Sequence, residues 1–142
     1  MANVGKYNVD TAYTSLMTTA LNSITTGSAT AASSAITNST NLALWMDVSL
    51  MLGSVNPSGT PYLELHLLPK AGDGSTYADR SAQTLVDTLV VTTGSSAKVA
   101  QSIGIVVPPG DYELMLVNQM GVTTASSGNT LYYRLYDMNL NG

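Results

Sequence analysis

Apolar and polar residues alternate with a period of two through most of the chain after residue 42. In the segment 42–52 every even position is apolar, from Leu42 to Leu52. This alternation predicts a β-strand with one face in a core. The same reasoning predicts strands over 62–68, 84–92, 97–107, 111–118 and 131–140, and a weaker strand over 29–37.

The alternation also assigns the face that each strand turns to the core. In the segment 97–107 it places four apolar residues on one face, with the polar Gln101 among them: Val99, Ile103, Ile105 and Val107. In the segment 131–140 it sets Leu131, Tyr133 and Leu135 against Tyr132, Arg134 and Tyr136.

Short polar segments rich in Gly, Pro and Ser separate these strands. The segment 93–96 (TGSS) has the composition of a hairpin turn, and the run 108–110 (PPG) forces a corner because proline cannot donate to a ladder. None of the gaps between the strands after residue 42 has the pattern of a crossover helix, which favours antiparallel pairing. We therefore predict an all-β fold, an antiparallel two-sheet sandwich of jelly-roll type.

The first forty residues follow a different pattern. Apolar residues recur at the spacing of an amphipathic helix, at Tyr13, Leu16, Met17, Ala20, Leu21 and Ile24. The Thr and Ser residues between them are poor helix formers and favour an extended chain instead. We predict an N-terminal arm over 1–28, either extended or a short helix, and a β-sandwich domain over 29–142.

Composition excludes several classes of function. Of the 142 residues, 5 are Lys or Arg and 9 are Asp or Glu, so the chain has no basic surface for nucleic acid or an anionic membrane. No cysteine is present, which excludes disulfides and thiol catalysis. No apolar run is long enough for a membrane span or a signal peptide. We expect no cofactor, no metal and no small-molecule substrate.

Two groups of residues are weak candidates for chemistry. Glu64 and His66 share a strand face and could form an acid–base pair, although the chain has a single histidine and catalysis needs more groups aimed at one point. The loop from Asp73 to Asp79 has oxygen ligands at alternate positions but lacks the bidentate acid of a calcium loop. We therefore expect a polar surface pair, a solvated loop and no enzymatic activity.

Aromatic residues on the polar strand faces are stronger candidates for binding. Trp45 lies on the polar face of its strand, and Tyr132 and Tyr136 flank Arg134 on another. Such residues can stack on sugar rings, and they are also typical of protein interfaces. We predict a set of interface residues that also includes apolar residues of the arm: Tyr13, Leu16, Met17, Trp45, Tyr132, Arg134 and Tyr136.

The low charge of the chain points the same way. Charged residues make up 10%, against about 25% in an ordinary soluble domain. The 16 Ser and 18 Thr residues supply much of the polar surface instead. Short side chains lose little conformational entropy when they are buried, and a surface with few charges repels its neighbours weakly. This composition favours permanent packing against other polypeptides.

Three segments give the chain a resemblance to small structural proteins of tailed bacteriophages: 34–42, 103–118 and 125–134. The resemblance implies a virion protein with a β-sandwich body, of the capsid decoration (cement) type. It also implies a homotrimer bound to the major capsid protein, assembled in the cytoplasm of a bacterial host. We expect the trimer to form through a sheet face that carries Trp45 or the row of Tyr132, Arg134 and Tyr136. The alternatives are a phage tail, baseplate or fibre protein, and a carbohydrate-binding module.

Overall fold

The computed structural model describes residues 6–9, 12–40 and 42–139. Eight β-strands and two 3-10 helices lie in this part of the chain, and neither helix is long or apolar enough to cross a membrane. Their bounds are β1 (Lys6–Val9), β2 (Thr14–Met17), η1 (Thr19–Leu21), β3 (Trp45–Val55), β4 (Tyr62–Pro69), η2 (Ala82–Thr84), β5 (Leu85–Val90), β6 (Ser96–Val106), β7 (Tyr112–Gln119) and β8 (Thr130–Asn139).

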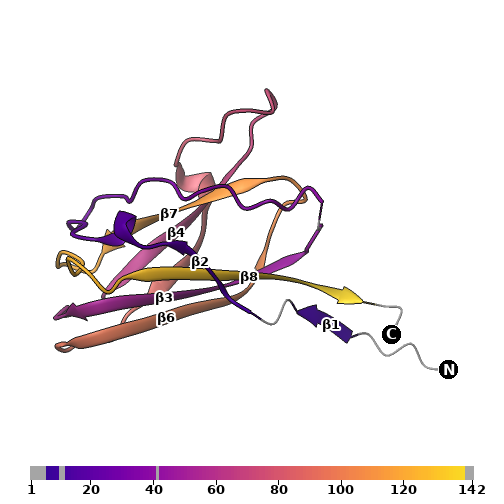
Figure 1. Ribbon diagram of the computed structural model, residues 1–142. Coiled ribbons are helices and arrows are strands. Elements are labelled where there is room, and N and C mark those ends of the chain that lie inside the picture. The colour runs from indigo at the N-terminus through magenta and orange to yellow at the C-terminus, as the bar shows by residue number, and fades with distance from the viewer. Residues whose placement is uncertain (1–5, 10–11, 41, 140–142) are drawn as a thin grey trace.

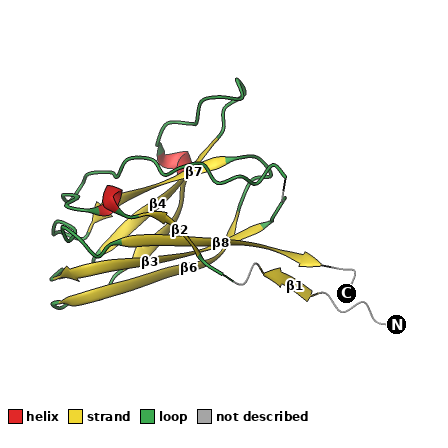
Figure 2. Cartoon of the chain, viewed as in Figure 1, coloured by secondary structure: helices red, strands yellow, loops and turns green. Residues whose placement is uncertain are grey.

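The strands form two antiparallel sheets in separate layers, and the predicted all-β sandwich is confirmed (Figures 1 and 2). Sheet A has the order β1-β8-β3-β6, and β2 also pairs with β8. Sheet B has the order β5-β4-β7. In Figure 1, β3, β6 and β8 make up the lower layer, and β4 and β7 lie above them.

The segment 24–38 extends sheet B along the free edge of β7. Its backbone N–H groups at Thr30, Ser33 and Ile36 donate to β7 carbonyls at distances of 2.7 to 2.8 Å. In return, the N–H of Leu116 donates to Thr30 Oγ1 and that of Leu114 to Ser33 Oγ. Two hydroxyl side chains thus replace the backbone carbonyls of a regular strand. The weak strand predicted over 29–37 is therefore an irregular edge segment with isolated bridges.

With this segment included, the chain has the strand order of a jelly roll. Apart from β1, sheet A holds β2, β8, β3 and β6, and sheet B holds the segment 24–38, β7, β4 and β5. Consecutive elements mostly alternate between the two sheets, which is the connectivity of a double-sheet jelly roll.

The core lies between the sheets and is built from alternate residues of each strand. Sheet A contributes Met46, Val48, Leu50 and Leu131, and sheet B contributes Leu63, Leu65, Leu67, Leu89, Tyr112, Leu114 and Leu116, all of them buried. Leu131, Tyr133 and Leu135 of β8 face this core, as the alternation predicted. The period of two therefore identified the inner face of β8 correctly.

The chain from Tyr13 to Ile24 is not an amphipathic helix, so that alternative for the arm is wrong. Residues 14–17 form β2 on the edge of β8, and a single 3-10 turn follows. The β2 ladder has a register shift between Ser15 and Met17, which lets both Leu16 and Met17 pack on the core. The helix-like spacing thus comes from a bulged strand and a turn. Residues 1–5 and 10–11 of the predicted arm lie outside the described residues.

The assignment of one shared face to Val99, Ile103, Ile105 and Val107 is also wrong. The β3–β6 register shifts between the pairs Val48–Ser102 and Met46–Ile105, and Gly104 within the shift has a φ of 71°. This bulge reverses the side-chain alternation of β6. Val99 and Ile103 are therefore exposed, whereas Ile105 and Val107 are buried.

Two smaller expectations also change. The segment 93–96 joins β5 of sheet B to β6 of sheet A, so it is an arch between the sheets rather than a hairpin turn. Leu42 and Leu44 are exposed because β3 begins only at Trp45, and the backbone of Leu42 has a positive φ of 49°. The alternation of apolar residues thus begins three residues before the strand itself does.

Candidate interaction face

Two aromatic residues meet on the outer face of sheet A, near one end of β3 and β8. Trp45 and Tyr136 are directly opposite each other in the β3–β8 ladder. Their ring centroids are 5.8 Å apart and the ring planes differ by 24°, so the rings are stacked. Stacked cross-strand aromatic pairs stabilise a sheet and leave a broad apolar surface.

The next outward pair in the same ladder is ionic. Asp47 and Arg134 are directly opposite each other, and both Nη2 and Nε of the guanidinium approach Asp47 Oδ2, at 2.8 and 2.9 Å. The other carboxylate oxygen accepts the backbone N–H of Gly104 at 2.9 Å. Asp47 is only 4% exposed, although it lies on the outer face. The Asp47 carboxylate thus accepts two hydrogen bonds, and its charge is neutralised by the ion pair with Arg134.

Tyr13 completes this arrangement from the segment before β2. Its ring centroid lies 4.7 Å from the guanidinium carbon of Arg134, which is the geometry of a cation–π contact. The hydrogen bond to Asp47 raises the pKa of Arg134 above its usual value. We call this group, consisting of Tyr13, Trp45, Asp47, Arg134 and Tyr136, the aromatic–arginine cluster. The two charges of its ion pair cancel.

The structure thus brings together four of the seven residues predicted for an interface: Tyr13, Trp45, Arg134 and Tyr136. Tyr132 lies on the same outer face, opposite Ser49 on one side and Ser15 on the other. Leu16 and Met17 do not join them, because Met17 is buried in the core and Leu16 packs against it.

Sequence reasoning missed Asp47 as the partner of Arg134. The two residues are 87 positions apart, and only the register of the β3–β8 ladder makes them neighbours. The one signal in the sequence was that Asp47 is the single charged residue of β3, two positions after Trp45.

Exposed aliphatic residues continue the face beyond the cluster. Val106, directly opposite Trp45 in the β3–β6 ladder, is 73% exposed, and Ile103 is 74% exposed. Leu44, directly before β3, is also exposed, and its carbonyl accepts the N–H of Val107. Aromatic residues and arginine with surrounding aliphatic groups are the composition of a protein-binding surface.

Glu64 and His66 do form a pair, but the expectation of a surface pair is wrong for His66, which is buried. His66 Nε2 lies 3.2 Å from Glu64 Oε2, and His66 Nδ1 lies 2.9 Å from Thr84 Oγ1 in η2. The Thr84 hydroxyl donates to the Ser81 carbonyl and accepts the Ser81 N–H, so Nδ1–H is the donor toward Thr84. His66 is buried, and its hydrogen bond to Thr84 connects η2 to sheet B.

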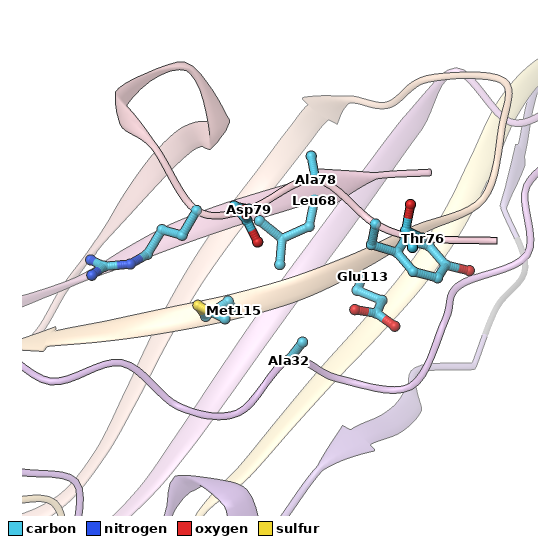
Figure 3. Close-up of a pocket in the computed structure, with 9 residues that line it drawn as sticks. Ala32, Leu68, Thr76, Ala78, Asp79, Glu113 and Met115 are labelled. Atoms are coloured by element: carbon cyan, nitrogen blue, oxygen red, sulfur yellow. The ribbon is translucent and has the colours of Figure 1, made fainter. Parts of the chain in front are cut away.

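The loop between β4 and η2 lies over the outer face of sheet B and borders an open pocket of about 330 Å³. Figure 3 shows Asp79 of the loop above Glu113 and Met115 of β7, with Ala32 of the segment 24–38 at the lower border. The pocket belongs to sheet B, whereas the aromatic–arginine cluster belongs to sheet A.

The loop tip that faintly resembles a calcium site is stabilised by its own donors. Asp73 Oδ1 accepts the N–H groups of Ser75 and Thr76, and Oδ2 accepts the Thr76 hydroxyl. The Thr76 side chain, followed by the two backbone donors, lowers the pKa of Asp73 well below its usual value. Among the residues that the structure describes, no three His, Asp or Glu side chains are grouped as metal ligands would be.

No protein-family model matches the chain, and no curated protein matches it.

Proposed function

We propose that the protein is a structural component of a virion, of the capsid decoration type, and that it binds other protein subunits through the aromatic–arginine cluster. The single observation that carries this proposal is the outer face of sheet A. Trp45 and Tyr136 stack there beside an ion pair whose charges cancel, and Val106 extends the apolar area.

The chemistry of this face suits a lasting contact between proteins. Trp, Tyr and Arg are the residues that contribute most to binding when a partner covers them. Because Asp47 already neutralises Arg134, a partner can cover both residues without supplying a counter-charge. A neutral, partly apolar face of this kind favours burial in an assembly.

Fold and composition agree with a role in an assembly. The double-sheet jelly roll is an architecture found in viral capsid domains and in lectins. Only 10% of the residues are charged, so a shell can hold many copies close together with little repulsion.

Decoration would stabilise a shell by mass action. A protein that binds the mature form of a shell better than any other form shifts the equilibrium toward it. Several linked copies bind more tightly than one, because each bound copy raises the effective concentration of the next. The homotrimer and the major capsid protein as partner are part of this proposal.

The test is binding to shells of the parent virus from which this protein has been stripped. Purified protein is added back and the bound copies per shell are counted by quantitative mass spectrometry. We expect near-stoichiometric binding to the major shell subunit, and loss of binding for Trp45→Ala. Tyr62→Ala, which removes a half-buried aromatic from the other sheet, is the matched control and should bind normally.

Two other functions predict different results, in this experiment or in a glycan-binding assay. A tail, baseplate or fibre protein would be present in a few copies per particle and would not bind stripped shells. A carbohydrate-binding module would use the Trp45–Tyr136 stack as a platform for sugar rings, so Trp45→Ala would abolish binding on a glycan array. Either result would overturn the capsid role.

A further inference from the structure

Strand β6 forms an open edge of sheet A. It pairs with β3 on one side, and it ends the strand order of the sheet in the part of the chain that the structure describes. Figure 1 shows β6 at the border of the lower layer. With eleven residues, it is as long as β3, the longest inner strand of the sheet. An open edge exposes backbone N–H and C=O groups that can pair with another strand.

Natural proteins usually protect such an edge with charged side chains, but β6 has none exposed. Its one charged residue, Lys98, is buried, and its ammonium group donates to the carbonyls of Thr93 and Gly94 and to Ser96 Oγ. The exposed side chains of β6 include Val99 at 59% and Ile103 at 74%. The stretch of β6 before the bulge at Gly104 is therefore an open edge without an exposed charge.

The neighbouring edge of sheet B has the same character. Strand β5 lies beside β6, and Asp87 of β5 accepts a hydrogen bond from Ser102 of β6. Val90 of β5 is 72% exposed, and Leu85 and Val86 are also exposed. Exposed apolar side chains therefore lie on both strands at this side of the sandwich, and Asp87 is the one charged residue of β5.

The outward residues of β6 form a palindrome. Before the bulge, the outer face of β6 carries Val99, Gln101 and Ile103. The central amide thus has an apolar residue on each side. Two such strands, paired antiparallel about Gln101, place each Val99 opposite the partner's Ile103. Within one chain, Gln101 Nε2 donates to Ser49 Oγ at 3.3 Å. The second N–H and the oxygen of each Gln101 amide can then pair with the partner's amide at the twofold axis. On the inner face the small residues Ala100 and Ser102 meet in the same way.

We infer that a second copy of this chain pairs with β6, strand to strand and antiparallel, with Gln101 at the twofold axis. The pairing joins two copies of sheet A into one continuous sheet. It supplies backbone partners to both open edges and covers Val99 and Ile103. Self-complementarity of one patch is what a twofold contact between identical subunits requires.

Cysteine substitution tests this contact directly, because the natural chain contains no cysteine and an introduced one can pair only between molecules. Residues directly opposite in an antiparallel pair have Cα atoms about 4.5 to 5.5 Å apart, which is within disulfide range. We expect Gln101→Cys to form a disulfide dimer under mild oxidation at least about tenfold faster than Ser75→Cys at the exposed loop tip.

The register has its own test. When Val99→Cys and Ile103→Cys proteins are mixed, the inferred register predicts mixed disulfide dimers in preference to dimers of either variant alone. The double variant Val99→Lys, Ile103→Lys places charges on the edge and should abolish the contact in size-exclusion chromatography with light scattering. Both positions are exposed, and circular dichroism would verify that this variant is folded.

Equal disulfide rates for Gln101→Cys and Ser75→Cys would overturn the inference, and so would a preference of Val99→Cys for itself. The contact is separate from the aromatic–arginine cluster and does not depend on the proposed function. Ile103 adjoins the face that carries the cluster, so the single variant Val99→Lys separates the two contacts. A homotrimer built through the cluster would survive Val99→Lys, whereas the twofold contact would not.

Discussion

Asp47 of β3 and Arg134 of β8 are cross-strand neighbours joined by a hydrogen bond and an ion pair, and the same carboxylate also accepts the N–H of Gly104 in β6. One buried side chain therefore connects three adjacent strands at the point where β6 bulges. Tyr13 lies against the guanidinium group and links the segment before β2 to the same pair.

We predict that Arg134→Met destabilises the fold more than its exposure suggests. The substitution leaves the nearly buried carboxylate of Asp47 without its counter-charge, and loss of one partner of such a pair reduces the free energy of unfolding by about 3 kcal/mol. Urea denaturation measures the change. The double variant Asp47→Asn, Arg134→Met should lose less than the sum of the two single variants, because the unpaired charge is removed. Strict additivity would contradict the coupling.

The Thr84 hydroxyl provides a second test of a buried network. Thr84→Val keeps the shape of the side chain but removes the group that accepts from His66 and Ser81 and donates to the Ser81 carbonyl. We expect a loss of about 1 to 3 kcal/mol in the free energy of unfolding, because buried polar groups lose their partner. Thr84→Ser retains the hydroxyl and should lose less. An equal loss for both variants would contradict the role of the hydroxyl.

Asp111 couples the end of the segment 24–38 to β7 in a manner that depends on pH. Hydrogen bonds from Ser39, first through its side chain and then through its backbone, lower the pKa of Asp111 below the ordinary value. A carboxyl with a lowered pKa in the folded state stabilises the fold above its unfolded pKa, and this stability is lost as pH falls through the folded value.

Stability should therefore decrease as pH falls below about 4. Ser39→Ala should raise the pKa of Asp111 toward the ordinary value, measured by NMR titration of its carboxyl carbon. Ser58→Ala, in the turn between β3 and β4, is the control and should leave that pKa unchanged. A carboxyl that titrates identically in the natural protein and in Ser39→Ala would contradict the role of Ser39.

Truncation separates the part of the N-terminal region that the fold needs from the part that it does not. Removal of residues 1–9 eliminates β1, which pairs only with β8, and should leave a cooperative unfolding transition. Removal of residues 1–25 also eliminates Met17 and Leu21, both in the core, and should reduce the free energy of unfolding by more than about 4 kcal/mol. Thermal denaturation measures both losses, and similar values for the two truncations would contradict this assignment.

Much of the fold was predictable because strand periodicity is a local property. In β4, β7 and β8 every second side chain faces the core, so the inner faces were readable from the chain alone. The segment 24–38 was harder to predict, because its residues 30, 33 and 36 step by three along β7 residues that step by two. The hydroxyl groups of Thr30 and Ser33 accept the β7 N–H groups and so make this mismatch possible. The segment therefore lacks the alternation of apolar and polar residues that identifies a regular strand.

The sequence alone determined an all-β sandwich, a low-charge surface and the presence of outward aromatic residues, because each follows from residue type and local spacing. Only the tertiary structure decided which of those residues meet. The pairing of Asp47 with Arg134 depends on the register between distant strands, and the exposure of Val99 and Ile103 depends on a bulge at Gly104. Register and bulges arise from interactions between strands, so they are not contained in the pattern of any one strand.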